Sequence, residues 1–140
     1  MDLWRRASMV TWQVQIPALT TDYSVYIPDL LFFGGSITGR GHRTPVFQVE
    51  CLAAALGKLG VERCSVVGFS YGGMIAFKMA EARPELVQSL VVPGSVISMT
   101  ESINEAALKA LGVSSLSELL LPETLERLKA LLSIATYKKR

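Results

Sequence analysis

One stretch, Cys64–Ala82, constrains the fold of this chain more than any other. An apolar, β-branched run stops at Gly68, and apolar residues recur at helical spacing a few residues later. These changes predict a strand, a tight turn and a helix in immediate succession. Ser70 occupies the turn, with Gly68 two residues before it and Gly72 two residues after it.

This Gly-x-Ser-x-Gly spacing is typical of a nucleophile elbow, in which a serine stands exposed on a sharp turn from strand to helix. We expect a Cβ at either Gly68 or Gly72 to collide with neighbouring backbone, because strand and helix pass close together there. The backbone of Ser70 is expected to be strained, at a cost of about 1 to 3 kcal/mol. The N–H of Tyr71, at the start of the helix, would point to where an oxyanion forms.

A family resemblance rests on these residues. Gly68–Met74, followed by Ala80–Val87, closely resembles the α/β-hydrolase superfamily, and Tyr26–Leu30 resembles the strand and turn two elements earlier. The chain looks like a plant-type esterase or lipase-like member from about Met9 onward. The resemblance implies a serine hydrolase of carboxylic esters or similar acyl bonds, with a small-molecule substrate and no cofactor. Ser70 would be the nucleophile, acting with an acid and a histidine.

The order of elements predicts an α/β fold. Short β-branched or aromatic runs alternate with amphipathic helices, which indicates a parallel sheet with right-handed crossovers. The expected strands are Tyr23–Pro28, the run at Val66 and Val67, and Val87–Val92. Helices are expected from Thr44–Pro45 to Gly60 and from Gly72 to Ala82. Such a sheet of about three strands leaves open edges that a partner could cover.

The ends of the chain carry weaker signals. Between Met9 and Ile16 the pattern fits either a strand or a helix, and the resemblance favours a helix. Residues 1–8 are interpreted as a tail, 9–94 as a partial α/β-hydrolase core, and 95–140 as the start of a helical lid. The lid segment should hold helices over Thr100–Leu111 and Pro122–Ala135. Its leucine stripe is interpreted as packing rather than membrane contact: Leu125, Leu128 and Leu132.

The loop Phe32–Arg43 is rich in glycine, and Gly39-Arg40-Gly41 before a helix suggests a phosphate cradle. Thr44 breaks the dinucleotide fingerprint, and no Walker lysine is present. A mobile surface loop is therefore favoured.

The count of catalytic partners argues against activity. A serine needs a general base oriented by an acid, and this superfamily carries both after the serine. No Asp and no His follow Ser70, and the one histidine, His42, lies upstream at a position that does not match. His42 is interpreted as an exposed loop residue, and Met1–Ser8 lacks the loop that gives the second oxyanion donor. The alternative is an inactive, truncated fragment that acts as a binding or interaction module or has no function.

Composition excludes some partners. The formal net charge is only +2, and no basic stripe with interleaved aromatic residues exists, so nucleic acid is not expected. Cys51 and Cys64 are interpreted as buried free thiols, not as a disulfide framework or metal site. Neither a secretory signal nor a membrane span is recognised, so a cytoplasmic location is expected over organelle targeting.

Overall fold

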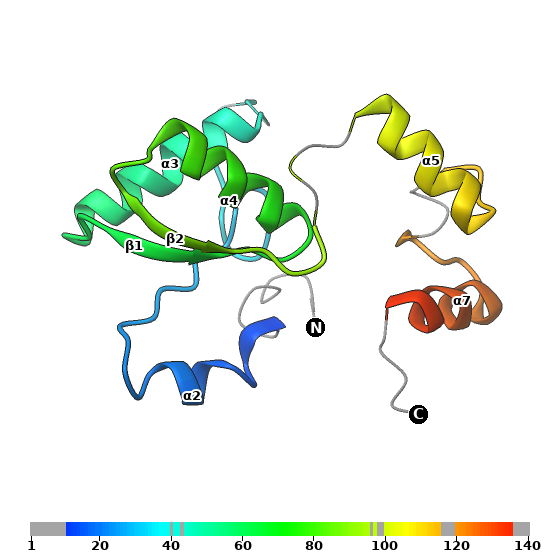
Figure 1. Cartoon of the computed structure of the whole chain (residues 1–140), viewed down its shortest axis with the longest axis horizontal. Helices are drawn as coiled ribbons and strands as arrows, with labels where there is room; N and C mark the ends of the chain where they lie inside the picture. Colours follow the sequence, from blue (N-terminus) through cyan, green and yellow to red (C-terminus); the bar gives the residue numbers. More distant parts are fainter. Residues whose placement is uncertain are drawn as a thin grey trace. The chain divides into compact units, whose positions relative to one another are not determined.

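The computed structural model describes residues 11–39, 41–42, 44–95, 97, 100–115 and 120–135. The chain divides into two units, Met1–Ile97 and Ser98–Arg140. The first unit holds the sheet with its covering helices, and the second holds helices (Figure 1).

The sheet of the first unit has two parallel strands, β1 (Cys64–Val67) and β2 (Val87–Val91). The helix α4 (Tyr71–Ala82) connects them, so the predicted strand, turn, helix and strand are confirmed. Val66 pairs with Leu90 and Val67 with Val91, and the register shifts between Cys64 and Ser65. The elbow follows β1 directly and so lies at the carboxyl end of this strand. Because the strands run parallel, the carboxyl end of β2 lies beside it.

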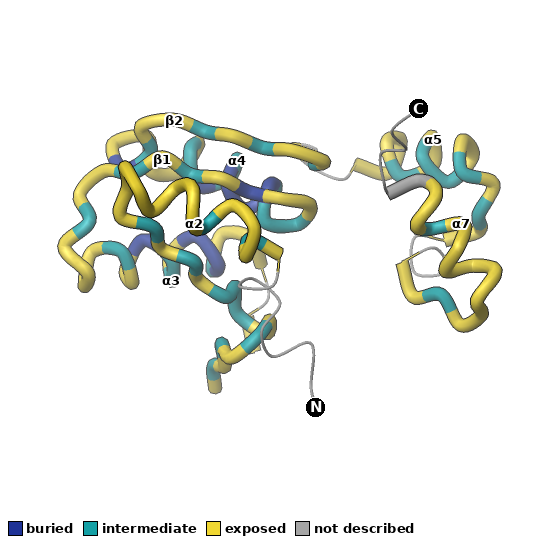
Figure 2. Tube along the Cα trace, turned by 90° about the horizontal axis from the view of Figure 1, so that it is seen from below, coloured by how far each residue is buried: buried dark blue, intermediate teal, exposed yellow. Residues whose placement is uncertain are grey.

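The core lies between the sheet and two helices. α3 (Pro45–Lys58) packs beside α4 on one face of the sheet (Figure 1). Thr44 caps α3 by accepting a hydrogen bond of 3.2 Å from the N–H of Phe47, and Pro45 follows, as predicted. The buried positions concentrate on these two helices (Figure 2). The buried apolar cluster comprises Val49, Ala53, Ile75, Met79 and Leu86.

The predicted strand Tyr23–Pro28 is wrong. Residues 24–30 have no regular secondary structure, and the described sheet has two strands instead of about three. The aromatic and β-branched content of this segment shows that it suits a pleated, half-buried surface, but a strand also needs a hydrogen-bonded neighbour. No backbone hydrogen bond in the described part of the chain joins Ser24–Pro28 to β1, although both line one cavity.

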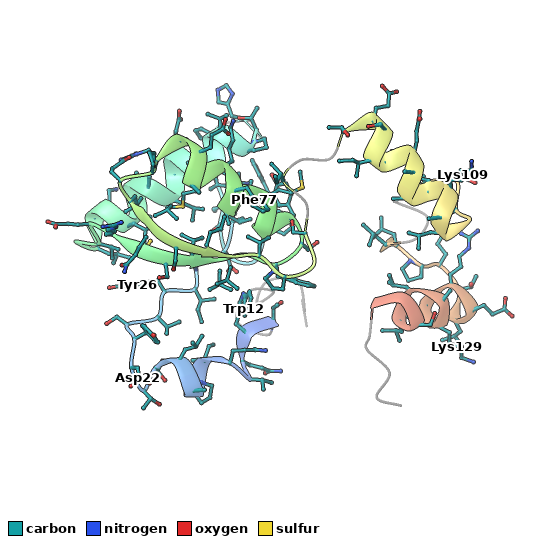
Figure 3. The ribbon with its side chains drawn as sticks, in the orientation of Figure 1. Trp12, Asp22, Tyr26, Phe77, Lys109 and Lys129 are labelled. Atoms are coloured by element: carbon teal, nitrogen blue, oxygen red, sulfur yellow. The ribbon has the colours of Figure 1, made fainter. Side chains whose placement is uncertain are left out.

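The segment before it is helical where it is described. Thr11 and Trp12 are in helical conformation, a turn follows, and α2 spans Ile16–Leu19. The helix favoured over Met9–Ile16 is therefore confirmed in part, and Met9 and Val10 lie outside the described residues. Figure 3 shows Trp12 and Tyr26 on the side of the sheet opposite α3 and α4.

The second unit contains the two helices predicted for it. α5 spans Glu101–Leu111, with Thr100 as its cap and Gly112 in left-handed conformation at its end. α7 spans Leu125–Ala135, three residues later than Pro122 suggested. The stripe of Leu125, Leu128 and Leu132 is exposed in this unit. None of the helices described here is long and apolar enough to cross a membrane.

Candidate active site

Ser70 adopts the conformation that a nucleophile elbow requires. Its φ of 54° and ψ of −124° lie in a region that residues other than glycine rarely occupy. Ser70 lies in the short turn between the end of β1 and the first residue of α4, and it is the N-cap residue of that helix. This strained backbone agrees with the expectation from the sequence.

The glycines of the turn have different roles from those expected. A Cβ on Gly68 would lie 2.5 Å from the carbonyl oxygen of Gly72, so the predicted clash at Gly68 is confirmed. A Cβ on Gly72 would meet no atom within 4 Å, so the predicted clash there is wrong. The second crowded position is Gly73, where a Cβ would lie 2.5 Å from the side chains of Val92 and Ser95. α4 therefore presses against the segment after β2 at Gly73.

Three donors hold the carbonyl oxygen of Ser70. The N–H groups of Gly73 and Met74 donate at 2.9 and 3.4 Å. The hydroxyl of Ser95 donates at 2.6 Å. These bonds stabilise the strained residue from the helix and from the loop after β2.

Tyr71 begins α4 and has two features that bear on the site. Helix geometry leaves its N–H without an acceptor inside the helix, and the helix dipole favours negative charge at this end. Its ring stacks on Phe33, with 5.8 Å between the ring centroids and 27° between the planes. The Tyr71 N–H therefore lies at the positive end of α4, next to Ser70, and the Tyr71 ring packs on an aromatic neighbour.

Hydrogen bonds hold the first part of the loop that carries Phe33. The carboxylate of Asp29 accepts a hydrogen bond of 3.0 Å from the N–H of Gly35, and its carbonyl accepts one of 2.6 Å from the Ser36 hydroxyl. Leu31 is bonded to the side chain of Gln48 on α3. The sequence interpretation placed Asp29 in a turn after Pro28, but it did not identify the bonds of the Asp29 carboxylate or the role of Gln48.

His42 is an exposed loop residue, as interpreted. Its ring lies against Phe47, with 5.4 Å between the centroids. No hydrogen bond within the described residues joins His42 to Ser70. The described part of the chain therefore contains a strained serine at the start of a helix, and no hydrogen bond there joins it to a histidine.

A cavity of about 1290 Å³ runs from the elbow along β1. Ser70, Tyr71 and Phe33 line it at one end, and apolar residues such as Trp12 and Ile16 line it elsewhere. Its walls are mainly apolar, which suits an uncharged organic group. Within the described ranges, no three His, Cys, Asp or Glu side chains gather closely enough to hold a metal ion.

Comparison with known proteins identifies the family. Residues 5–135 match the family model described as alpha/beta hydrolase fold, and the chain belongs to this family. The structure accordingly represents part of an α/β-hydrolase fold, with a small parallel sheet and flanking helices.

Two relatives and one solved structure show how similar this chain is to known hydrolases. The chain is 36% identical over 84 residues to the putative carbamate hydrolase RutD of Stutzerimonas stutzeri, covering 57% of this chain and 31% of that protein. It is 34% identical over 85 residues to the pimeloyl-[acyl-carrier protein] methyl ester esterase of Aeromonas hydrophila, covering 60% and 32%. The meta-cleavage product hydrolase of Pseudomonas fluorescens IP01 shares the fold, with a TM-score of 0.66 and 22% identity, covering 91% of this chain and 44% of that one. The chain spans about a third of the length of the curated relatives it matches.

Proposed function

We propose that this chain carries the nucleophile of a serine hydrolase that acts on carboxylic esters or similar acyl bonds. The observation that carries the proposal is the backbone of Ser70, held at a φ of 54° between β1 and α4. Strain of this kind persists only where the surroundings enforce it, and here three hydrogen bonds to the Ser70 carbonyl do so. That the matched relatives are named as hydrolases supports the same class of reaction.

The reaction would proceed by acyl transfer. The Oγ of Ser70 attacks the carbonyl carbon of the ester and forms a tetrahedral intermediate. The N–H of Tyr71 stabilises the negative oxygen of that intermediate. The bond from carbon to the alcohol oxygen then breaks, the alcohol leaves with a proton, and water later releases the acid. The apolar cavity would hold the acyl or alcohol group of the small-molecule substrate.

This mechanism requires a general base beside Ser70. A serine hydroxyl attacks slowly unless a neighbouring group removes its proton. His42, the only histidine, lies against Phe47. We therefore propose that Ser70 in this chain is exposed but not activated.

A second candidate follows from the same observation. A chain in which Ser70 never reacts would be a catalytically inactive form, which binds a ligand in the cavity or a partner along the sheet edges. Of the described strands, β1 and β2 pair only with each other, so each has one edge available for such a partner. Within either candidate, α5 and α7 are proposed as the start of a helical lid.

Labelling with a fluorophosphonate separates the two candidates. The reagent is incubated with the folded wild type, Ser70→Ala and His42→Ala, and the adduct is located by mass spectrometry. The serine hydrolase proposal predicts a slow adduct on Ser70, absent in Ser70→Ala and unchanged in His42→Ala. The absence of any adduct after long incubation of the folded chain would favour the inactive form. Rapid labelling that His42→Ala abolishes would show that His42 is the base.

A further inference from the structure

Gln48 is a buried polar side chain with no role in the elbow itself. It lies on α3 among apolar core residues and is only 3% exposed. Its Oε1 accepts a hydrogen bond of 2.8 Å from the N–H of Leu31, and its Nε2 donates one of 3.1 Å to the carbonyl of the same residue. The amide thereby bonds both backbone groups of Leu31, as a neighbouring strand would. Burial of an amide side chain is costly without hydrogen-bond partners, so the structure depends on these two bonds between Gln48 and Leu31.

The segment that Gln48 holds is a tight turn. The N–H of Phe33 donates to the carbonyl of Leu30 at 2.9 Å, and the N–H of Ser36 donates to the carbonyl of Phe33 at 3.0 Å. Phe32 has a φ of 71°, which is unfavourable for a bulky residue. A turn with a strained residue needs outside support. Gln48 gives this support from the helix side.

The turn ends at the candidate active site. Phe33, two residues after Leu31, stacks on the ring of Tyr71. Both rings line the same cavity as Ser70. A continuous set of contacts therefore joins the buried amide on α3 to the first residue of α4: Gln48, Leu31, Phe33 and Tyr71.

We propose that Gln48 is a positioning residue of the Ser70 site. It fixes the turn that holds Phe33 on Tyr71, and it thereby sets the aromatic wall and the oxyanion donor beside the nucleophile. This inference rests on the proposed function for its chemical meaning. The coupling between Gln48 and Tyr71 can nevertheless be measured without any reaction.

The test follows the Tyr71 amide and ring signals by nuclear magnetic resonance in the full chain. Phe33→Leu, at a position that is 46% exposed, defines the shift that loss of the ring contact produces. Gln48→Ala should move the Tyr71 signals in the same direction and abolish the nuclear Overhauser effect between the Phe33 and Tyr71 rings. Glu50→Ala is the matched control, because it changes an exposed neighbour of Gln48 on the same helix and leaves the core unchanged. It should leave the Tyr71 signals in place.

A second variant, Gln48→Glu, distinguishes loss of the hydrogen bonds to Leu31 from general unfolding of the chain. A protonated carboxyl group has one donor and one acceptor and can replace the amide at Leu31, whereas a carboxylate has only acceptors. Burial raises the pKa of such a group. The Tyr71 signals of Gln48→Glu should therefore match the wild type at about pH 5 and the Phe33→Leu pattern at about pH 9. The Tyr71 signals of the wild type should not show this difference between the two pH values.

Two results would overturn the inference. One is a folded Gln48→Ala chain with unmoved Tyr71 signals while Phe33→Leu moves them. The other is a Gln48→Glu chain whose Tyr71 signals do not depend on pH.

Fluorophosphonate labelling of Ser70 should also slow in Gln48→Ala, by up to about a hundredfold, because small displacements at a reacting site are costly. If the wild type is never labelled at Ser70, the proposed function fails, while the resonance experiment still decides the role of Gln48.

Discussion

The hydroxyl of Ser95 donates a hydrogen bond of 2.6 Å to the backbone carbonyl of Ser70. This bond joins the loop after β2 to the strained residue after β1, across the carboxyl ends of two paired strands. The elbow is therefore stabilised by a segment 25 residues further along the chain as well as by its own helix.

Removal of this bond should loosen the elbow. We expect Ser95→Ala to lower the free energy of unfolding by about 1 kcal/mol, the usual net value of one hydrogen bond. Urea denaturation measures this change, and labelling of Ser70 should slow as well. Ser89→Ala is the control, because it removes the 2.6 Å bond from Ser89 to Ser65 on the sheet. If both variants label Ser70 at the wild-type rate, Ser95 does not support the elbow.

The two glycines that flank Ser70 should respond differently to alanine. Gly68→Ala places a methyl group 2.5 Å from a rigid carbonyl oxygen, so we expect a loss of about 2 kcal/mol in the free energy of unfolding. Gly72→Ala meets open space within a helix and should be neutral or stabilising by up to about 1 kcal/mol. Thermal and urea denaturation of both variants test this order. Equal losses in the two variants would contradict it.

The core depends on Ile75 of α4, which is 1% exposed. Ile75→Ala removes buried apolar atoms and leaves a cavity, so we expect a loss of about 3 kcal/mol in the free energy of unfolding. Ile37→Ala provides the comparison, since Ile37 is 90% exposed and its truncation should change stability by less than about 0.5 kcal/mol. A loss below about 1 kcal/mol for Ile75→Ala would show that the cluster does not form as described.

Cys64 gives a prediction that depends on pH. Burial raises the pKa of the Cys64 thiol, so the reactive thiolate forms at higher pH in the folded chain than in the unfolded chain. In a Cys51→Ser background, the pH profile of alkylation by iodoacetamide should therefore lie at higher pH without urea than with it. Identical profiles in the two conditions would refute the prediction.

The same pKa difference affects stability. Because the folded pKa is the higher one, the contribution of Cys64 to stability is complete below the pKa of the thiol in the unfolded chain. It is lost as the pH rises through the folded pKa. Cys64→Ser should reduce this alkaline loss, which urea denaturation across the pH range can measure.

Patterns of neighbouring residues in the sequence correctly predicted the helices, caps and turn that depend on short-range interactions. The change from a β-branched run to helical spacing identified the elbow, and Thr44 followed by Pro45 identified the start of α3. These features depend on residues close together in the sequence. The same kind of reasoning placed Ser70 and Tyr71 on their elements correctly.

The parallel pairing of β1 and β2 was predicted, but several other features that depend on distant contacts were not. Tyr23–Pro28 has strand composition, but pairing is decided by a neighbour that composition does not reveal. The close approach at Gly73 depends on Val92 and Ser95, which follow β2. Gln48 escaped notice because a glutamine in an amphipathic helix is normally assigned to solvent.

Chemical rescue by imidazole tests the central claim most directly, namely that this chain has a nucleophile without its base. Hydrolysis of p-nitrophenyl acetate is followed in the folded wild type and in Ser70→Ala, with increasing imidazole. The rate due to imidazole alone is subtracted. We predict a rate that rises with imidazole in the wild type and stays at background in Ser70→Ala. Equal rates in the two proteins at every imidazole concentration would contradict the assignment of Ser70 as the nucleophile.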